Sequence, residues 1–358
     1  MKHLNTLITG TGSYIPSLII KNRDFVNHIF YNKDQSAIDN PGENVVKKFL
    51  DITGISERRW AEDNLTCSDI AAIAAKKAIE DSGIDPETLD HIIMAHNFGD
   101  VLKSTIQSDL VPCLAARVKQ TLKIKNSACI AYDILFGCPG WIQGFIQADS
   151  FIKSGLAKKC LVIGAETLSR VVDKYDRDTM IFADGAGAAV IEAREESNKR
   201  GFLSSATQTD SIEEAYYLYL GKSNQPKSDP KVRYMKMDGR KVYEYTLNNV
   251  PLAIKAALDK TDVPVKQIKK IIIHQANEKM DEAIIKRFFK LYNIKQDIEK
   301  IMPMNIYELG NSSVATVPTL YDMVIKGKLK NHNIHKDDII IFASVGAGMH
   351  VNALVYRH

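Results

Sequence analysis

Two short patterns occur in the first part of the chain and again, in the same order, in the second part. The strand-like run Leu89–His96 resembles Ile268–His274, and the glycine-rich run Asp184–Val190 resembles Val345–Gly348 and the strand after it. Ordered repeats of this kind are typical of duplicated structural units. Chance similarity between buried strands could produce either match alone. The shared order predicts two halves, residues 1–200 and 201–358.

Strand-like and helical runs alternate along both halves, which predicts an α/β architecture with largely buried sheets. The predicted strands are Leu4–Ile8, Ile92–Ala95, Ile130–Phe136, Leu161–Gly164, Ala188–Glu192, Ile268–Ile273, Ile339–Ala343 and Val351–Tyr356. Helical spacing of apolar residues predicts helices over Ser68–Ser82, Val111–Leu122, Pro139–Ser154 and Val242–Leu258, and a helix containing Met280, Ile284 and Phe288. The polar runs Asn22–Glu43 and Gly221–Arg233 predict surface loops.

Composition limits the class of protein. The 358 residues are 45% hydrophobic and 25% charged, as in ordinary soluble globular proteins. A net charge of +4, spread along the chain, does not indicate nucleic-acid binding. No apolar run approaches the roughly 20 residues that a membrane-spanning helix needs. The five cysteines form no C-x-x-C pair and no secretory leader is recognisable, so we expect reduced cysteines and a cytoplasmic protein.

A single cysteine stands at a predicted turn from a strand into a helix. The apolar run before Cys138 predicts a buried strand, and apolar residues recur at helical spacing after it. Pro139 suits the first helical position, because its missing N–H would have no partner there. A thiol at a helix start lies at the positive end of the helix dipole, which lowers its pKa and favours a nucleophile. The alternative is a buried structural cysteine, the usual state of free cysteines.

Three further segments carry residue types that could act beside a nucleophilic thiol. His274 follows a run of isoleucines, and α/β proteins place their sites at the carboxyl ends of such strands. A lone histidine, however, is more often a hydrogen-bonded structural residue. The run Leu309–Pro318 is a turn of small residues, and Ala343–His350 ends a strand in a glycine-rich corner. Glycines permit tight turns, and they also let backbone N–H groups approach a substrate oxygen.

Together these segments resemble the thiolase superfamily, and within it the β-ketoacyl-[acyl-carrier-protein] synthase III family. The resemblance runs from Leu7–Pro16 to the last strand, Asn352–Val355. Its most specific parts are the cysteine corner, His274–Asn277 and Gly310–Ser313, in family order. The resemblance implies a thiolase-like layered αβαβα fold, in which each half contributes a sheet and the first half carries the active cysteine.

The resemblance also implies a Cys/His/Asn site. Cys138 would accept an acyl group from a thioester, and the backbone N–H groups of Cys138 and Gly348 would bind the oxyanion formed during transfer. His274 and Asn311 would bind the thioester carbonyl of a malonyl group on acyl carrier protein. Loss of CO₂ would leave an enolate that attacks the acyl-enzyme and yields a β-ketoacyl product of fatty-acid or related lipid synthesis. Such an acyltransferase would need no metal or other cofactor.

The partners implied by the resemblance are an acyl thioester, malonyl-acyl carrier protein and a second copy of the chain, since family members are typically homodimers. Whether coenzyme A or carrier protein delivers the acyl group is open. Because carrier protein is acidic, basic residues after His274 are expected to bind it. The candidates, which equally suit any exposed helix, are Lys279, Lys286 and Arg287. Phe136 stands where the family has a small residue and is expected to reshape the acyl pocket.

Other functions stay open at this stage. One alternative within the superfamily is a ketosynthase that joins two acyl chains, as in dialkylresorcinol-type synthesis. Another is a catalytically silent partner subunit that binds acyl chains, although intact Cys138, His274 and Asn311 argue against it. Nucleotide binding through Gly10–Gly12 is poorly supported, because the third glycine of the dinucleotide pattern is missing and Pro16 follows where a helix would begin.

Overall fold

The computed structural model describes residues 2–358, whose strands form two main β-sheets. The first sheet has the order β1-β7-β6-β4-β5, and the second has the order β11-β12-β13-β8. Parallel pairs (β5 with β4, β4 with β6, β11 with β12) adjoin antiparallel ones in both sheets. The strands of the first sheet are β1 (His3–Tyr14), β4 (His91–His96), β5 (Ile130–Leu135), β6 (Lys159–Thr167) and β7 (Asp184–Glu196). Those of the second are β8 (Gly201–Thr209), β11 (Ile268–Ile273), β12 (Ile339–Gly346) and β13 (His350–Arg357).

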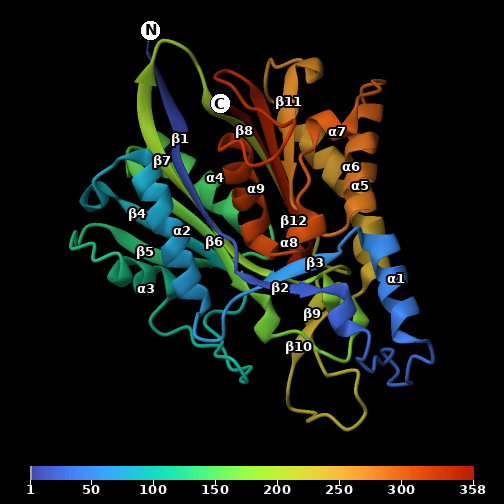
Figure 1. Cartoon of the computed structure of the whole chain (residues 1–358). Helices are drawn as coiled ribbons and strands as arrows, with labels where there is room; N and C mark the ends of the chain where they lie inside the picture. The colour runs from blue at the N-terminus through green and yellow to red at the C-terminus, as the bar shows by residue number, and fades with distance from the viewer. Residues whose placement is uncertain (1) are drawn as a thin grey trace.

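Helices cover both outer faces of the sheets and fill the space between them (Figure 1). The helices α4 (Gly140–Lys153) and α9 (Thr316–Ile325) lie between the sheets, where Trp141, Phe145 and Tyr321 pack in one buried cluster with residues of both sheets. The outer face of the first sheet packs on α2 (Cys67–Ser82) and α3 (Leu114–Thr121). The second packs on α5 (Gly239–Leu258) and α6 (Glu278–Lys290). This αβαβα layering confirms the predicted fold class.

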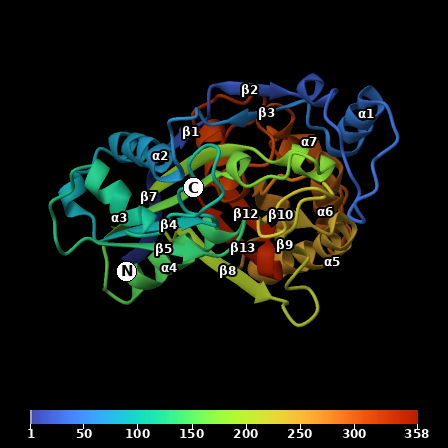
Figure 2. The ribbon, with the colours of Figure 1, turned by 90° about the horizontal axis from the view of Figure 1, so that it is seen from below.

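Shorter elements gather at one end of the two sheets, the end seen in Figure 2. They are α1 (Gly42–Thr53), α8 (Ile306–Leu309), the antiparallel pair β2 (Leu18–Lys21) and β3 (Glu57–Trp60), and the hairpin of β9 (Leu218–Gly221) and β10 (Tyr234–Met237). The short helix α7 (Ile298–Ile301) lies instead beside β11 (Figure 1). A buried ion cluster fastens this hairpin to the first half. Lys236 Nζ of β10 lies 2.6 Å from Asp173 Oδ2 and 2.9 Å from Asp176 Oδ2. The hairpin therefore covers the end of the sheets as a fixed part of the structure.

The predicted strands and helices all coincide or overlap with observed ones, with small differences at their ends. Pro139 is the residue before α4 rather than its first helical residue, and α3 begins at Leu114 instead of Val111. The predicted loop Asn22–Glu43 contains a short 3₁₀ helix, Asn22–Phe25, and its end forms the start of α1. The sequence patterns did not predict α1. The division at residue 200 stays a prediction, although the two sheets draw their strands from opposite sides of it.

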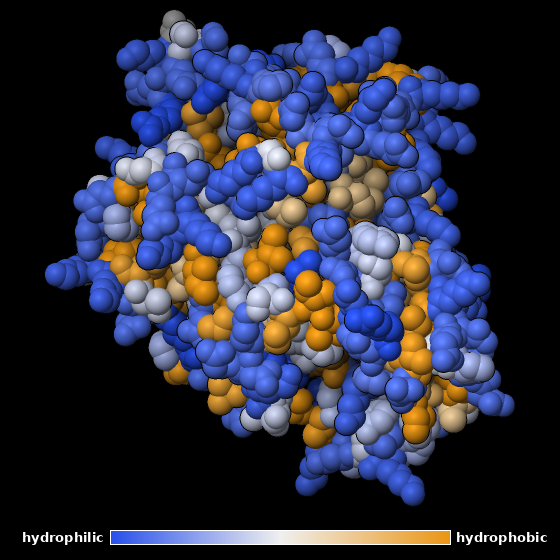
Figure 3. Space-filling model, in the orientation of Figure 1, coloured by the Kyte–Doolittle hydropathy of each residue, from blue (hydrophilic) through white to orange (hydrophobic). Residues whose placement is uncertain are grey.

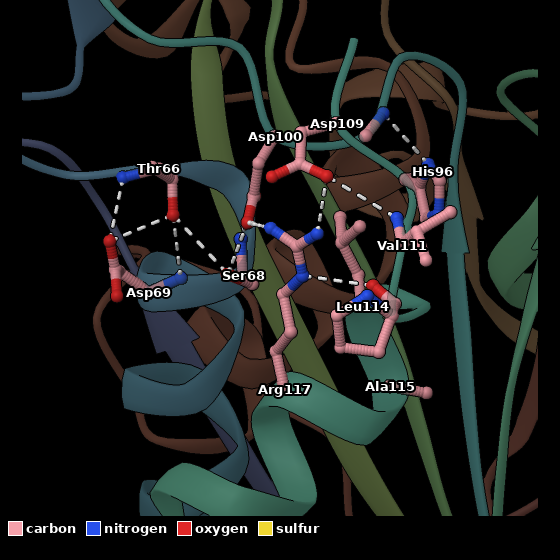
Figure 4. A network of polar contacts seen from close by, with 12 residues as sticks. Thr66, Ser68, Asp69, His96, Asp100, Asp109, Val111, Leu114, Ala115 and Arg117 are labelled. Atoms are coloured by element: carbon pink, nitrogen blue, oxygen red, sulfur yellow. Dashed lines mark hydrogen bonds and ion pairs between the residues drawn. The ribbon is translucent and has the colours of Figure 1, made fainter.

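A polar network holds the long segment after β4 against α2 and α3 (Figure 4). Arg117 of α3 donates to Asp100 Oδ2 at 2.8 Å and to Asp109 Oδ1 at 2.7 Å. Ser68, at the start of α2, donates to Asp100 from its backbone N–H at 2.7 Å and from its hydroxyl at 2.6 Å. The segment is therefore tied to α2 and α3 at Asp100, shortly after β4, and again to α3 at Asp109.

Hydrophilic side chains cover most of the face seen in Figure 3, and the hydrophobic residues among them form separate patches. Within residues 2–358, none of the helices combines the length and the apolar character that crossing a bilayer requires.

Candidate active site

A cavity of about 270 Å³ brings together the three residues expected to carry the chemistry. Cys138 reaches it from the turn between β5 and α4, His274 from the end of β11, and Asn311 from the loop after α8. The rest of the lining is mainly apolar and includes residues of the β9–β10 hairpin. Three segments that are remote in the sequence therefore meet at one cavity.

Close contact between two glycine-containing turns positions the thiol. Gly137 adopts a φ of +64°, in the left-handed region that favours glycine, and so turns the chain sharply before Cys138. A Cβ on Gly346 would lie 2.4 Å from the backbone nitrogen of Cys138. The end of β12 can therefore pack directly against the cysteine corner only because residue 346 has no side chain. Of the five free cysteines, all in the described part of the chain, Cys138 is the one that lines the cavity.

The side chains of the segment His274–Asn277 have different roles. The His274 backbone N–H donates to Ala343 O at 2.8 Å, which extends the pairing of β11 with β12, and its ring is buried beside the cavity. Gln275 donates to Pro303 O at 2.8 Å and accepts the backbone N–H of Asn305 at 3.0 Å. Asn277 caps α6 by accepting the N–H of Met280 at 3.0 Å. His274 is thus the member free for chemistry, while its neighbours hold the turn.

Backbone hydrogen bonds fix Asn311 against the first half of the chain. Its N–H donates to Ile181 O at 2.9 Å, and its carbonyl accepts the N–H of Ala183 at 2.8 Å. The side-chain Oδ1 accepts the backbone N–H of Ser313 at 2.8 Å. Because Oδ1 has this partner, the amide of Asn311 is oriented, and its NH₂ group is the part left to meet a substrate.

A chain of hydrogen bonds leads from a buried carboxyl to the thiol, and sequence reasoning gave none of its members a role. Ser313 Oγ donates to Cys138 Sγ at 3.2 Å, and Asn97 Nδ2 lies 3.2 Å from Ser313 Oγ. The same Nδ2 donates to Glu166 Oε1 at 2.6 Å. Glu166 is buried at the end of β6, and Asn97 directly follows β4. Their position at the carboxyl ends of parallel strands was the one signal available in the sequence.

The environment of Cys138 reverses the expectation of a lowered pKa. Burial raises the pKa of the Cys138 thiol to about 11, the nearby Glu166 adds to the rise, and the hydrogen bond from Ser313 opposes it. Burial likewise lowers the pKa of His274 to about 4. Loss of water around the thiolate thus outweighs the favourable helix start. The resting site holds a protonated thiol beside a neutral imidazole.

This arrangement predicts how alkylation of Cys138 depends on pH. Because iodoacetamide reacts with the thiolate, and thiolate forms as pH rises, the rate should climb about tenfold per pH unit from pH 7 to 10. The rate is measured by intact mass. Alkylation of the other cysteines is measured in Cys138→Ala and subtracted, and circular dichroism checks that the fold is retained. A rate that levels off at or below pH 8 would contradict the raised pKa.

Some predicted site residues lie elsewhere. Gly348 is not part of the cavity lining, whereas Gly346 and Ala347 are. A Cβ on Gly137 would lie 2.8 Å from the backbone nitrogen of Ala347, so the end of β12 meets the cysteine corner at Ala347. Phe136 does not line the cavity either. Its ring stacks instead on His350, the first residue of β13, with centroids 4.1 Å apart.

The basic residues predicted to bind a carrier are exposed on α6 but are not at the cavity. Lys279 donates to the carbonyl of Asp51, Lys286 pairs with Glu282, and Arg287 donates to Leu247 O and Asn248 Oδ1. A second cavity of about 430 Å³ adjoins the first and shares Ile181, Met237, Val242, Ala276 and Met280 with it. Exposed cations line this second cavity, which sequence reasoning did not identify: Lys48, Arg177 and Arg240.

Comparisons with known proteins identify the family of this chain. Family models for 3-oxoacyl-[acyl-carrier-protein] synthase III match residues 132–211, and those for its C-terminal part match residues 258–358. A β-ketoacyl-[acyl-carrier-protein] synthase III from Caldanaerobacter subterraneus subsp. tengcongensis is 35% identical, over 96% of this chain and 94% of the relative.

Solved structures agree over the full length. The 3-oxoacyl-[acyl-carrier-protein] synthase III from Aquifex aeolicus is 30% identical with a TM-score of 0.78, and the alignment covers 99% of this chain and 100% of the other. The corresponding β-ketoacyl synthase III from Thermus thermophilus is 29% identical with a TM-score of 0.81, covering 98% and 99%. Fold and sequence therefore both point to one family.

Proposed function

Because this chain belongs to the 3-oxoacyl-[acyl-carrier-protein] synthase III family, we propose that it joins an acyl group to a malonyl unit through an acyl-enzyme on Cys138. The observation that carries the proposal is the convergence of Cys138, His274 and Asn311 on one largely apolar cavity. A thiol, a neutral imidazole and an amide are the groups that acyl transfer followed by condensation requires.

In the first half-reaction, the Cys138 sulfur attacks the carbonyl of an acyl thioester. An S–C bond forms to Cys138, the bond to the carrier sulfur breaks, and the thiol proton ends on the departing carrier thiol. The hydrogen bond from Ser313 to Sγ stabilises the thiolate as it forms, which matters because burial holds the thiol protonated at rest. Asn97 and Glu166 keep the Ser313 hydroxyl directed at the sulfur.

In the second half-reaction, malonyl thioester loses CO₂ and its thioester oxygen acquires the negative charge of an enolate. His274 and Asn311 each donate a hydrogen bond to that oxygen. With a pKa of about 4, His274 is neutral at physiological pH, so it can donate from one ring nitrogen without adding a buried charge. The enolate carbon attacks the acyl group, the S–C bond to Cys138 breaks, and the thiolate takes up a proton.

The proposal is tested by supplying graded acyl thioesters, first alone and then with malonyl-acyl carrier protein. Intact mass should show one acyl group per chain, with the adduct mapped to the peptide that contains Cys138. Adding the malonyl substrate should discharge the adduct, release CO₂ and give a 3-oxoacyl product. Absence of an adduct with every acyl length tried would defeat the proposal.

For the oxyanion of the first half-reaction, we propose the backbone N–H groups of Cys138 and Ala347 as donors, in place of Gly348. The substitution Ala347→Pro removes one of these N–H groups, and it suits the backbone because Gly346 before it is extended, with φ −164° and ψ −168°. Acylation of Cys138 should slow by about 100-fold.

The control for that substitution is Ala347→Ser, which keeps the N–H and should acylate within a few-fold of the wild-type rate. The acylation rate of Cys138 is measured in both variants by quenched time courses, and melting curves check that each variant is folded. Equal rates in the two variants would remove Ala347 from the oxyanion site.

The second cavity is proposed as the entrance for the carrier. Its walls carry three cations, Lys48, Arg177 and Arg240, against one acid, Asp178, and this net positive charge suits a phosphorylated or acidic carrier. Arg240 also pairs with Glu244 at 2.9 Å. Lys279, Lys286 and Arg287 stay proposed contacts on the neighbouring face of α6. We also propose the homodimer typical of the family. It is supported by the edge position of β5, where Ile130 and Leu135 are 52% and 62% exposed.

A further inference from the structure

Three buried polar side chains that the mechanism does not use line the same cavity as Cys138. They are Thr246 of α5, Asp281 of α6 and Ser344 of β12, each at most 1% exposed. The Thr246 and Ser344 hydroxyls make no hydrogen bond with any residue from 2 to 358, and the Asp281 carboxyl has only weak contacts, from the backbone N–H groups of Ala276 and Asn277. Buried polar atoms in folded proteins nearly always have partners, so a group of such atoms around one cavity has hydrogen-bonding capacity left for water or for a ligand.

The position of these side chains separates them from the entrance. The helices α5 and α6 pack side by side (Figure 1), and Val250, Ile273 and Ile284 are apolar neighbours in the lining. We call the part of the cavity formed by these three residues and the three polar ones the inner lobe. None of its six residues lines the second cavity, through which the carrier would enter. The inner lobe is therefore suited to the acyl group rather than to its carrier.

The chemistry of the lobe favours a neutral partner. Burial raises the pKa of Asp281 well above its usual range, and the backbone N–H groups of Ala276 and Asn277 only partly oppose this. A protonated carboxyl group donates one hydrogen bond and accepts others, as the two hydroxyls do. An ammonium group would instead require a charge pair buried among apolar residues, which is unfavourable. A plain hydrocarbon chain would leave all these polar atoms unpaired.

We propose that the acyl substrate carries a hydroxyl or oxo oxygen along its chain, and that Asp281, with Thr246 and Ser344, binds this oxygen in the inner lobe. This inference rests on the function proposed above and names its substrate class. Asp281 is the central residue, since it offers two oxygens where each neighbour offers one. Specificity follows because a site built to hydrogen-bond an oxygen discriminates against the analogue that lacks it.

The test compares four coenzyme A thioesters of equal length: octanoyl, 3-hydroxyoctanoyl, 3-oxooctanoyl and 5-oxooctanoyl. The rate of adduct formation on Cys138 is measured for each by intact mass. At least one oxygenated chain should be preferred over octanoyl by about tenfold or more in the wild-type protein. In Asp281→Ala this ratio should fall to about one. In Asp281→Asn, which keeps a neutral donor and acceptor, the ratio should stay within about threefold of the wild-type ratio.

Controls separate this inference from a structural role of Asp281. Ile284→Val changes the apolar wall of the inner lobe and should leave the ratio unchanged. Thr246→Val removes a hydroxyl group while nearly keeping the side-chain shape, and it should lower the ratio. This variant replaces Asp281→Ala in the test if Asp281→Ala does not fold. The inference is overturned if the wild type does not prefer any oxygenated chain. It is overturned equally if the preference survives in Asp281→Ala, or in Thr246→Val where Asp281→Ala does not fold. It is also overturned if Asp281→Ala slows all four thioesters equally.

The proposed function has a separate readout in the same experiment. Adduct formation from octanoyl thioester alone supports the acyl-enzyme without bearing on the inner lobe. If none of the four thioesters gives an adduct, the proposed function fails and this inference fails with it. If adducts form at equal rates, the proposed function stands and the oxygenated substrate is rejected.

Discussion

Replacing Cys138 with alanine is expected to abolish formation of the acyl-enzyme and, with it, all 3-oxoacyl product. The physical reason is that the sulfur is the sole atom that bonds the acyl group during transfer, so no partial activity is expected from the surrounding donors. Incubation with labelled acyl thioester, followed by intact-mass analysis, measures the loss directly. The substitution removes a single sulfur next to a cavity, so the fold should be retained.

A matched control uses another cysteine of similar accessibility. Cys113 is also partly exposed, but it lies before α3 and does not line the cavity. Cys113→Ala should acylate at the wild-type rate. An adduct that persists in Cys138→Ala, or disappears in Cys113→Ala, would place the nucleophile elsewhere and would remove the central part of the proposed mechanism.

Replacing Asn311 with aspartate is expected to separate the two half-reactions. The carboxylate can still accept the backbone N–H of Ser313, so the local turn and the hydrogen bond from Ser313 to Cys138 should persist. It cannot donate to the enolate oxygen, and its negative charge opposes enolate formation. We expect condensation to fall by about 1000-fold, while acylation of Cys138 changes by no more than a few-fold.

Rapid-mixing measurements of the two half-reactions provide the check, because acylation serves as the internal control for folding and substrate binding. A His274→Gln variant offers a milder comparison, since its amide can still donate one hydrogen bond. If acylation and condensation decline together in Asn311→Asp, the residue supports the fold of the site and the assignment of an enolate donor is wrong.

The strands and helices that position the site were predictable because local periodicity reflects burial. The isoleucine run Ile268–Ile273 became β11 with the predicted bounds, and the pattern after Cys138 became α4. The helix α1 was missed although its apolar residues Val45, Val46 and Phe49 recur at helical spacing, whereas the strand β8 was missed because its pattern is weak. The strand β8 is apolar only at Phe202, Leu203 and Ala206 and lies at the edge of the second sheet, so its hydrophobic signal is weak.

The corrections at the site share one cause, which is contact between segments remote in the sequence. The sequence pattern predicted the helix start at Cys138. The burial that raises the pKa of the Cys138 thiol, however, comes from β12 and the Ser313 turn, which pack around it. Similarly, the approach of Ala347 to the cysteine corner depends on how the end of β12 meets Gly137. Neither contact has a local signature.

By itself the sequence determined the αβαβα architecture and the set of a thiol, an imidazole and an amide, since apolar periodicity and family motifs depend on nearby residues. Tertiary structure alone decided the protonation of Cys138, the chain from Glu166 to the sulfur, and the unpaired polar atoms around Asp281. The physical reason is that desolvation and hydrogen bonding depend on which atoms surround a group in space, and those atoms come from strands and helices far apart along the chain.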